Sequence, residues 1–169
     1  STDGDKVEKT TRVALYTNHT LYAHWEANKY TVSFNPNGGN VARGTMLATY
    51  NSTYGELPTP ELVGYTFLGW YTGVKEGSLV EPSTVMNVTY GHTLYAHWTA
   101  SNFIVPFDPT GGNVTQQSKV VTYDSAYGSL PVPSRAGYTF DGWYTNATGG
   151  ARVEPFTNVT TPRNHTLYA

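Results

Sequence analysis

The chain carries the stretch Gly64-Tyr-Thr-Phe-Leu-Gly-Trp-Tyr-Thr72 twice, the second time as Gly137-Tyr-Thr-Phe-Asp-Gly-Trp-Tyr-Thr145. The two copies are 73 positions apart. The stretch His19-Thr-Leu-Tyr-Ala-His-Trp25 returns at the same spacing as His92-Thr-Leu-Tyr-Ala-His-Trp98, and it begins again at His165. One fixed spacing along a whole chain is typical of a tandem array of structural units. The sequence therefore predicts small modules that repeat every 73 residues.

Within one repeat the pattern is mainly that of β-strands. Tyr30 to Phe34 alternates apolar and polar residues, which is the period of a half-buried strand, and Gly38-Gly39 predicts a turn after it. Pro58 and Pro60 remove two backbone donors, so the segment around them should cross over outside the sheet, extended or as a single helical turn. No stretch has helical periodicity over three turns. Strands are expected at 30–34, about 45–50, 65–72, around 85–88 and 93–98, with 119–123 as the second copy of 45–50.

The position of the repeat in the chain predicts three parts. Residues 1–25 are expected to be the C-terminal part of a preceding repeat, 26–98 a complete repeat, and 99–169 a second repeat that lacks its last residues. Two interpretations stay open, because the chain is either a window from a longer array or a protomer whose ends are completed by neighbouring copies. Residues 13–25 should expose an unpaired strand edge, which is suited to pairing.

The composition excludes several classes of function. Charged residues make up 13% of the chain and the net charge is −2, so no electropositive face is expected and nucleic acid is not a predicted partner. There is no cysteine, which excludes disulfides, zinc-thiolate sites and cysteine nucleophiles. No apolar run approaches the ~18 residues of a membrane span, so no membrane-spanning segment is predicted.

The pattern also lacks the residues of an active site. There is no Gly-x-Ser-x-Gly stretch, and Glu81 with Glu154 is the one acid kept in the loop of both repeats. A single carboxylate per repeat cannot act as both acid and base. His19 and His24 are an odd number of residues apart and point to opposite faces of a strand, which argues against a shared metal ion. We predict no enzyme, no catalytic or metal-binding residue, and no cofactor apart from covalent N-glycans.

The aromatic residues of the repeated motifs are expected to form the core of each module. Trp70 and Trp143 could instead stack on sugar rings. A core role is favoured, because so small a module has few other large groups to bury. The predicted core residues are Trp25, Phe34, Tyr65, Phe67, Trp70, Trp98, Phe107, Tyr138, Phe140 and Trp143.

The triplet Asn-x-Thr is over-represented. Seven of the twelve asparagines begin one, always with Thr in third place and never with Pro in second. This triplet is the acceptor for N-glycosylation in surface loops of secreted proteins, although a Thr-rich turn composition can also produce it. The predicted glycosylation sites are Asn18, Asn51, Asn87, Asn113, Asn146, Asn158 and Asn164.

The motifs together resemble a known family. Tyr30-Thr-Val-Ser-Phe34, Asn37-Gly-Gly39, Leu57-Pro-Thr-Pro60, the Gly-Tyr-x-Phe-x-Gly-Trp-Tyr core and the Leu-Tyr-Ala-x-Trp end follow in the order of the Listeria–Bacteroides repeat, which is also the B-repeat of internalins. The resemblance implies small α+β modules, β-grasp-like (ubiquitin-like), in arrays on secreted or wall-attached bacterial proteins. Pro106 stands where Ser33 stands in the other repeat. The sequence therefore does not decide whether that strand is central in the sheet of the second repeat.

We therefore expect a non-enzymatic, extracellular or cell-surface structural module that forms a stalk or fibre. Its predicted partners are neighbouring copies of the repeat, which would assemble head-to-tail. Linkers of about four residues, near 26–29 and 99–102, should allow little articulation. The alternative is an adhesin module that binds glycans or a host protein through exposed Tyr and Trp.

Overall fold

The protein is described by a computed structural model, which covers residues 5–14 and 16–169. Within this part the chain forms ten strands and no helix. The first sheet holds β1 (Lys29–Asn35), β2 (Thr45–Thr49), β3 (Tyr65–Tyr71), β4 (Leu79–Val80) and β5 (His92–Ala100). The second sheet holds β6 (Asn102–Asp108), β7 (Ser118–Thr122), β8 (Trp143–Tyr144), β9 (Arg152–Val153) and β10 (Leu167–Tyr168). We call residues 29–100 the first unit and residues 102–169 the second unit.

The two sheets have the same topology. Their strand orders are β2-β1-β5-β3-β4 and β7-β6-β10-β8-β9. The central strand β5 pairs in parallel with β1 and antiparallel with β3. The chain therefore enters a unit on one strand and leaves it on a parallel neighbour, so that entry and exit lie at opposite ends of the sheet.

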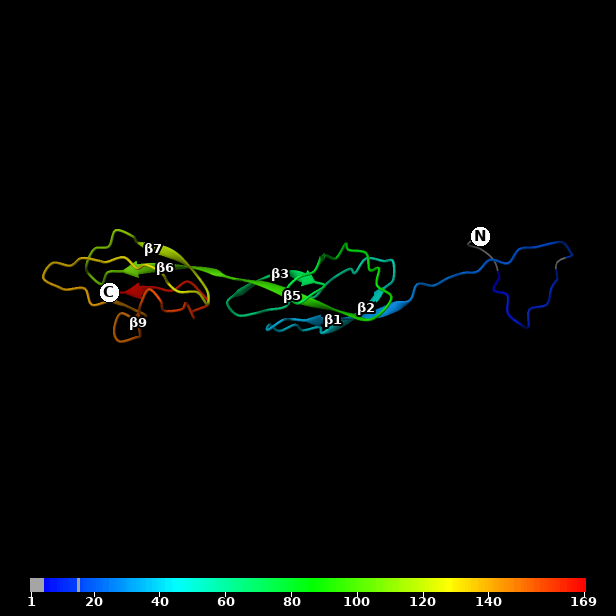
Figure 1. The fold of residues 1–169 in the computed structure, drawn as a ribbon, viewed down its shortest axis with the longest axis horizontal. Helices are drawn as coiled ribbons and strands as arrows, with labels where there is room; N and C mark the ends of the chain where they lie inside the picture. Colours follow the sequence, from blue (N-terminus) through cyan, green and yellow to red (C-terminus); the bar gives the residue numbers. More distant parts are fainter. Residues whose placement is uncertain (1–4, 15) are drawn as a thin grey trace.

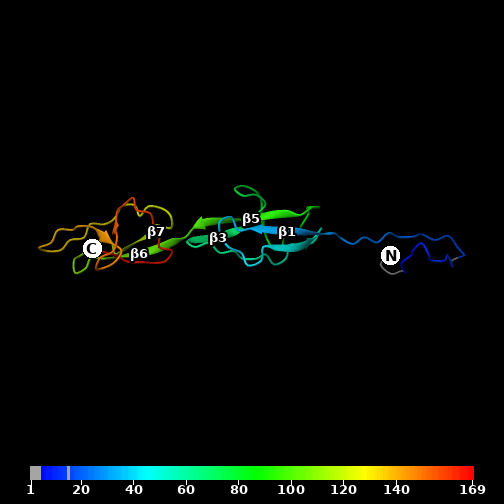
Figure 2. The same ribbon diagram turned by 90° about the horizontal axis from the view of Figure 1, so that it is seen from below.

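This topology makes the molecule long and narrow. The two units lie end to end, and the N-terminal segment extends away from the first unit in both views (Figures 1 and 2). Only Ser101 separates β5 from β6. The described residues before Lys29, which are 5–14 and 16–28, form no strand.

Each unit is built around one tryptophan. Trp70 and Trp143 are 1% and 2% exposed. The indole N–H of Trp70 donates to the Pro58 carbonyl at 2.7 Å, and that of Trp143 donates to the Pro131 carbonyl at 2.7 Å. An indole can be buried fully because its one polar atom has found an acceptor. The proline segments thus lie over the core as extended crossovers.

The other predicted core residues fall into two groups. Phe34 and Phe107 are buried beside the tryptophans, with ring centroids 4.8 Å and 4.9 Å away. Phe67, Trp98 and Phe140 are half-buried and pack against the cores. These residues form an aromatic layer on the sheet.

Three of the predicted core residues lie elsewhere. Trp25 is 92% exposed, because within the described residues no strand pairs with the segment that carries it. Tyr65 is half-buried outside the core cluster, since its ring packs on the second unit instead. Tyr138, which occupies the same position in the second unit, is 68% exposed because it has no following unit to meet in the described chain.

The mainly β fold in tandem modules is confirmed, whereas the β-grasp likeness is not, because the described residues contain no helix. Two local predictions were inaccurate. The strand expected near 85–88 is only an isolated bridge between Thr53 and Val85. The two-residue strand β4 was not expected, and it pairs with the end of β3.

Pro106 does not move its strand to the sheet edge, since β6 lies between β7 and β10. The Phe107 N–H donates to Gln117 on the β7 side, so the next residue back along the strand, Pro106, would present its N–H toward β10. The missing donor shortens that side of the sheet. Four residue pairs join β1 to β5, but only two join β6 to β10.

Candidate functional site

Histidines at equivalent positions of the two units pair with tyrosines. In residues 5–14 and 16–169, no three His, Cys, Asp or Glu side chains are grouped to hold a metal ion. His92 forms a hydrogen bond with the Tyr54 hydroxyl at 2.7 Å, and His165 repeats this pairing with Tyr127. Burial raises the pKa of Tyr54 and of Tyr127. These tyrosines therefore keep their protons up to higher pH than free tyrosine and can hold the hydrogen bond to histidine.

The first candidate site is the contact between the two units, which we call the junction. The Ser101 N–H donates to the Gly64 carbonyl at 2.9 Å, and the hydroxyl groups of Thr66 and Ser101 lie 2.9 Å apart. Tyr65 of the first unit and Tyr123 of the second meet edge to face, with centroids 5.6 Å apart and planes at 80°. Aromatic pairs with this geometry contribute about 0.5–1.5 kcal/mol beyond their buried area.

The junction also has a polar contact. The Tyr65 hydroxyl donates to the Asp124 carboxylate at 3.2 Å. Burial, together with this hydrogen bond and the carboxylate charge, raises the pKa of Tyr65. Gly64 has a φ of +80°, and a Cβ on it would lie 2.3 Å from the Tyr123 ring. Glycine is therefore needed at position 64 for both backbone conformation and close contact.

The second candidate site is an open slot at the far end of the second unit. In the first unit, the same place is filled by the last residues of β5. Trp98 packs on Phe67 with centroids 5.4 Å apart and donates its indole N–H to the Pro36 carbonyl at 2.9 Å. It also lies over Gly39, whose Cβ, if present, would be 2.8 Å from the indole.

The counterparts of these contacts line a cavity in the second unit. Pro109 and Phe140 correspond to Pro36 and Phe67, and they line a cavity of about 590 Å³ together with Ser134, Tyr138 and Ala169. Ala169 corresponds to Ala96, two residues before Trp98. The cavity, which we call the open slot, is thus the place that Trp98 fills in the first unit.

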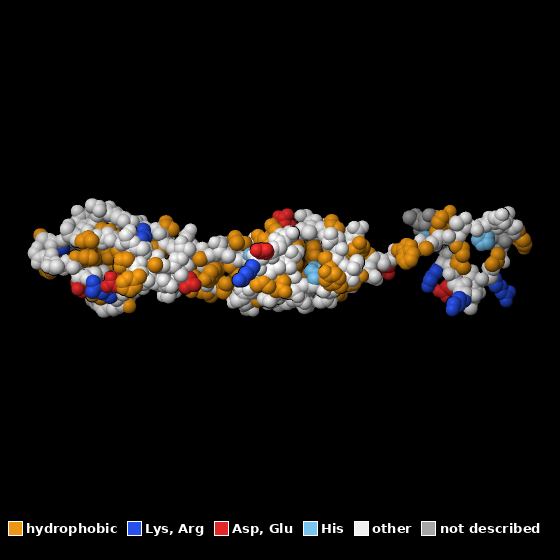
Figure 3. Space-filling view, in the orientation of Figure 1, with side chains coloured by type: hydrophobic (Ala, Val, Ile, Leu, Met, Phe, Trp, Pro, Cys, Tyr) orange, Lys and Arg blue, Asp and Glu red, His pale blue; other side chains and the backbone are white. Residues whose placement is uncertain are grey.

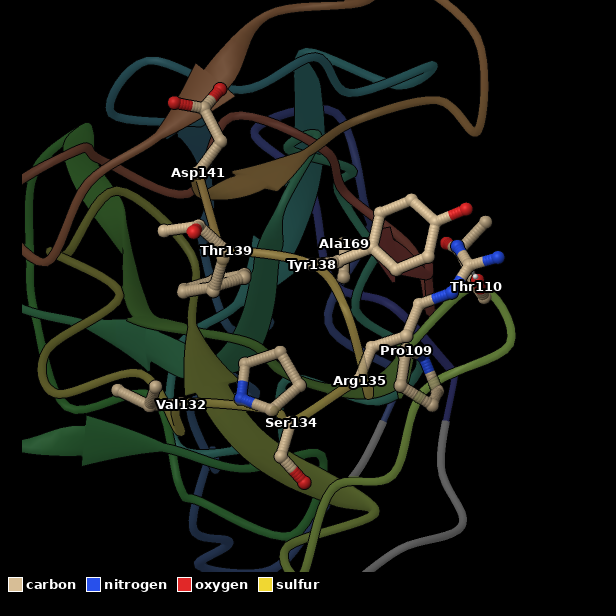
Figure 4. Close-up of a pocket in the computed structure, with 11 residues that line it drawn as sticks. Pro109, Thr110, Val132, Ser134, Arg135, Tyr138, Thr139, Asp141 and Ala169 are labelled. Atoms are coloured by element: carbon tan, nitrogen blue, oxygen red, sulfur yellow. Dashed lines mark hydrogen bonds between the residues drawn. The ribbon is translucent and has the colours of Figure 1, made fainter.

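Figure 4 shows the rim of the open slot. The Tyr138 ring lies beside Arg135, whose guanidinium carbon is 4.1 Å from the ring centroid. Arg135 also donates to the Thr110 carbonyl at 2.9 Å. On the opposite side Asp141 points away from these residues. The slot therefore has an aromatic and apolar floor and one cation at its edge.

Strand β8 is shorter than its counterpart β3. In the first unit Tyr65 to Tyr71 form a full strand, because β5 continues beside them to Ala100. In the second unit, β8 is reduced to Trp143–Tyr144 and pairs with β10 at one position, Tyr144 with Tyr168. Residues 138–142 are without a strand partner among the described residues.

The seven Asn-x-Thr asparagines all lie on the surface. Each is exposed and none belongs to a named strand. At Asn113 and Asn158 the middle residue of the triplet, Val114 or Val159, is buried while the asparagine points outward. The side-chain oxygen Oδ1 of Asn164 accepts a hydrogen bond from the Ile104 N–H at 2.8 Å, and the side-chain nitrogen of Asn164 takes no part in that bond.

Charge is sparse on the molecule, as Figure 3 shows for one face, where basic and acidic side chains are scattered. In the described residues there are two ion pairs, Lys6 with Glu8 and Arg152 with Glu154. Neither the junction nor the open slot is therefore built on a charge cluster.

Two equivalent β-sheet units in direct contact define a tandem-repeat protein. The family model of the Listeria-Bacteroides repeat domain matches residues 30–97 and 103–169, one match for each unit. The chain belongs to the Listeria-Bacteroides repeat domain family.

Similar proteins from bacteria agree with this assignment. The chain is 37% identical over 158 residues to a putative membrane protein of Evansella cellulosilytica. The aligned region covers 90% of this chain and 22% of that protein. It is 34% identical over 140 residues to internalin H of Listeria monocytogenes. The aligned region covers 83% of this chain and 24% of that protein. The chain thus spans less than a quarter of the length of these relatives. Family and relatives indicate a surface or secreted repeat protein.

The described residues include no apolar helix of the length needed to cross a membrane.

Proposed function

We propose that this chain is a non-enzymatic, extracellular structural module that acts as a stiff spacer in a stalk or fibre. The observation that carries the proposal is the junction. A flexible linker would let the two units move independently, but here Ser101 alone joins β5 to β6. The Tyr65 ring packs on Tyr123 of the second unit, and Thr66 and Gly64 form hydrogen bonds with Ser101 itself, which adds restraint beside the covalent link.

The topology supports the same function. Because entry and exit lie at opposite ends of each sheet, every added unit lengthens the array instead of folding back on it (Figure 1). The absence of a cluster of buried titratable groups in the described residues favours a mechanical over a chemical role. The family membership and the internalin H relative favour a location at the cell surface.

The test of the spacer function is the shape and stiffness of the monomeric chain in solution. Small-angle X-ray scattering and NMR relaxation of a dilute sample should report one elongated body with a single anisotropic tumbling time. Two units that tumble independently, with a broad distribution of distances between them, would contradict the proposal.

N-glycosylation is a second part of this proposal. The exposed, non-strand position of all seven Asn-x-Thr asparagines supports it, because a glycosyltransferase needs an accessible segment. Glycans would hydrate a surface that carries little charge and would hinder proteases.

The alternative function is an adhesin that binds a glycan or a host protein. Exposed aromatic rings support it, such as that of Tyr138, which has the Arg135 guanidinium beside it. Binding on a glycan array that is lost in the Tyr138→Ala variant would support this function over the spacer function.

A further inference from the structure

The second unit has a tight turn at residues 154–157, and the first unit has the same turn at residues 81–84. In both turns the threonine N–H donates to the glutamate carbonyl at 2.9 Å, and the threonine hydroxyl accepts a hydrogen bond from the glutamate N–H at 2.9 Å. The threonine carbonyl then accepts a hydrogen bond from Tyr127 in the second unit, at 2.9 Å, and from Tyr54 in the first, at 3.0 Å. The two turns are thus one local structure that occurs twice.

Two exposed positions of this local structure differ between the units, and they differ together. Phe156 stands where the first unit has Ser83, and Asn158 stands where it has Val85. Asn158 begins an Asn-x-Thr triplet that ends at Thr160. A single exposed apolar side chain is common on protein surfaces and indicates nothing by itself. Here, however, the aromatic ring and the predicted glycan acceptor occur together in one unit and are both absent from the other.

Phe156 and Asn158 lie on the same outer side of their segment. Thr157 is half-buried and Val159 is fully buried, whereas Phe156 and Asn158 are exposed. Asn158 forms an isolated antiparallel bridge with Ala126, so the backbone is extended at this point. Alternate residues of an extended segment point to one side and are about 6.5 Å apart. A sugar on Asn158 therefore begins beside the Phe156 ring.

The Phe156 ring is presented on a fixed support. It is 78% exposed, and among the described residues it belongs to neither core cluster. Pro155, the preceding residue, has a φ fixed by its ring, and its carbonyl accepts a hydrogen bond from the Gly128 N–H at 2.8 Å. Because the turn is already ordered, covering the ring with a ligand costs little conformational entropy.

We propose that the first sugar of an N-linked glycan on Asn158 stacks on the ring of Phe156. The ligand class is a β-linked pyranose with an apolar face, on which the C–H groups point toward the negative face of the aromatic ring. The contact removes apolar surface from water and holds the turn closed. This inference rests on the proposed N-glycosylation and deepens it by assigning one site and the contact that the glycan makes there.

Attachment of the glycan needs a glycosyltransferase and an activated donor, an oligosaccharide carried on a lipid diphosphate. The side-chain nitrogen Nδ2 of Asn158 forms a bond to C1 of the first sugar and loses one proton. The bond from C1 to the diphosphate oxygen breaks, and the diphosphate leaves with the electron pair. The Phe156 ring takes no part in this transfer and acts only on the product.

The first test looks for the contact directly by NMR. The chain is produced in a host that attaches N-glycans, and the glycans are trimmed enzymatically to the first sugar. We expect nuclear Overhauser effects between the Phe156 ring and the C–H protons of the sugar on Asn158, and an upfield ring-current shift of those protons. The Phe156→Ser variant, which has the residue of the first unit at this position, should lose both signals.

The internal control is the triplet at Asn87 in the first unit. Asn87 is exposed, but the residue two positions before it is Val85 and not an aromatic residue. A sugar on Asn87 should therefore show no such ring-current shift. A glycan on Asn158 that gives neither signal in the original chain would overturn the proposal.

The second test measures the contact through the stability of the turn segment. Amide hydrogen exchange is followed at Tyr127 and Val159, whose N–H groups hold this segment to the second unit. The original chain is compared with Phe156→Ser, with Asn158→Gln and with the double variant. In glycosylated chains each single change should speed exchange roughly threefold to tenfold, and the double variant should be no faster than either single one. Additive effects of the two changes would contradict the stacking.

The same variants from a host without the transferase are the matched control, and they should show no coupling between the two positions. The outcomes also separate this inference from the proposals on which it rests. Bare Asn158 in the natural protein overturns the inference, while glycans on the other triplets would still support N-glycosylation. A glycan on Asn158 without contact or coupling overturns the inference alone. Stiffness of the dilute chain is measured separately, so neither result bears on the spacer function.

Discussion

The ring of Tyr123 covers the backbone of Gly64 and stands edge-on to Tyr65 across the boundary between the two units. This relationship joins two sheets that share no ladder hydrogen bonds. It explains why a glycine and a tyrosine stand side by side at 64 and 65 and again at 137 and 138. At 64 and 65 this pair is the surface on which the second unit packs.

Gly64→Ala should loosen the junction. The added methyl group would overlap the Tyr123 ring, while the same change at Gly55, which also has positive φ, would meet nothing. We expect the Gly64 variant to lose the Tyr65–Tyr123 contact and the Ser101 hydrogen bond, which together stabilise the junction by about 1–2 kcal/mol. Amide exchange at Ser101 should then be roughly tenfold faster. NMR relaxation should then report two tumbling times. Equal behaviour of the two variants would show that the junction adds no stiffness.

Trp70→Ala should unfold the first unit or bring it close to unfolding. The side chain is 1% exposed and its N–H is bonded to Pro58, so the change leaves a large cavity and an unpaired carbonyl. A loss of roughly 3–5 kcal/mol is typical of such a truncation. Denaturant unfolding followed by circular dichroism measures it. Leu68→Ala, on the exposed face of the same strand, is the control and should change little. A small effect of Trp70→Ala would contradict the core assignment.

Alkaline pH should destabilise both units. Burial raises the pKa of Tyr54 and of Tyr127 above the ordinary value of 10.0, so the folded chain holds these two protons more tightly than the unfolded chain. The contribution of these tyrosines to the free energy of unfolding is constant below about pH 10. It is lost as the pH rises through their pKa values in the folded chain. The free energy of unfolding, measured in urea from pH 7 to 11, should fall only above about pH 10. In the double variant Tyr54→Phe and Tyr127→Phe, that fall should be smaller.

The natural protein should carry N-linked glycans at several of its seven Asn-x-Thr triplets. All seven asparagines are exposed. Glycopeptide mass spectrometry before and after enzymatic removal of N-glycans would detect each site through the conversion of Asn to Asp. The remaining five asparagines, which lack the triplet, serve as the internal control. Unmodified asparagine at all seven sites would refute the prediction.

The repeat and its strands could be read from the sequence because they depend on local patterns. Alternation from Tyr30 to Phe34 and the Gly38-Gly39 turn are enough to predict β1 and the hairpin to β2, which the structure confirms. The strand β4 could not be predicted, because its two residues, Leu79 and Val80, show no periodicity and are defined only by pairing with β3. A strand that short is specified by its neighbour.

The core and the junction could not be separated from sequence alone. Tyr65 and Phe67 are aromatic residues of the same repeated motif, so the sequence predicts both to be core residues. Only the position of the second unit shows that Tyr65 contacts Tyr123 whereas Phe67 contacts Trp70.

The parallel pairing of β1 with β5 has a consequence for tension. A pull on the chain before Lys29 and after Ala100 drags these two neighbouring strands in opposite directions along their length. The hydrogen bonds between the two strands are then loaded together in shear, instead of breaking one after another. Each unit should unfold only at high force. The second unit, in which the equivalent ladder between β6 and β10 is shorter, should unfold first.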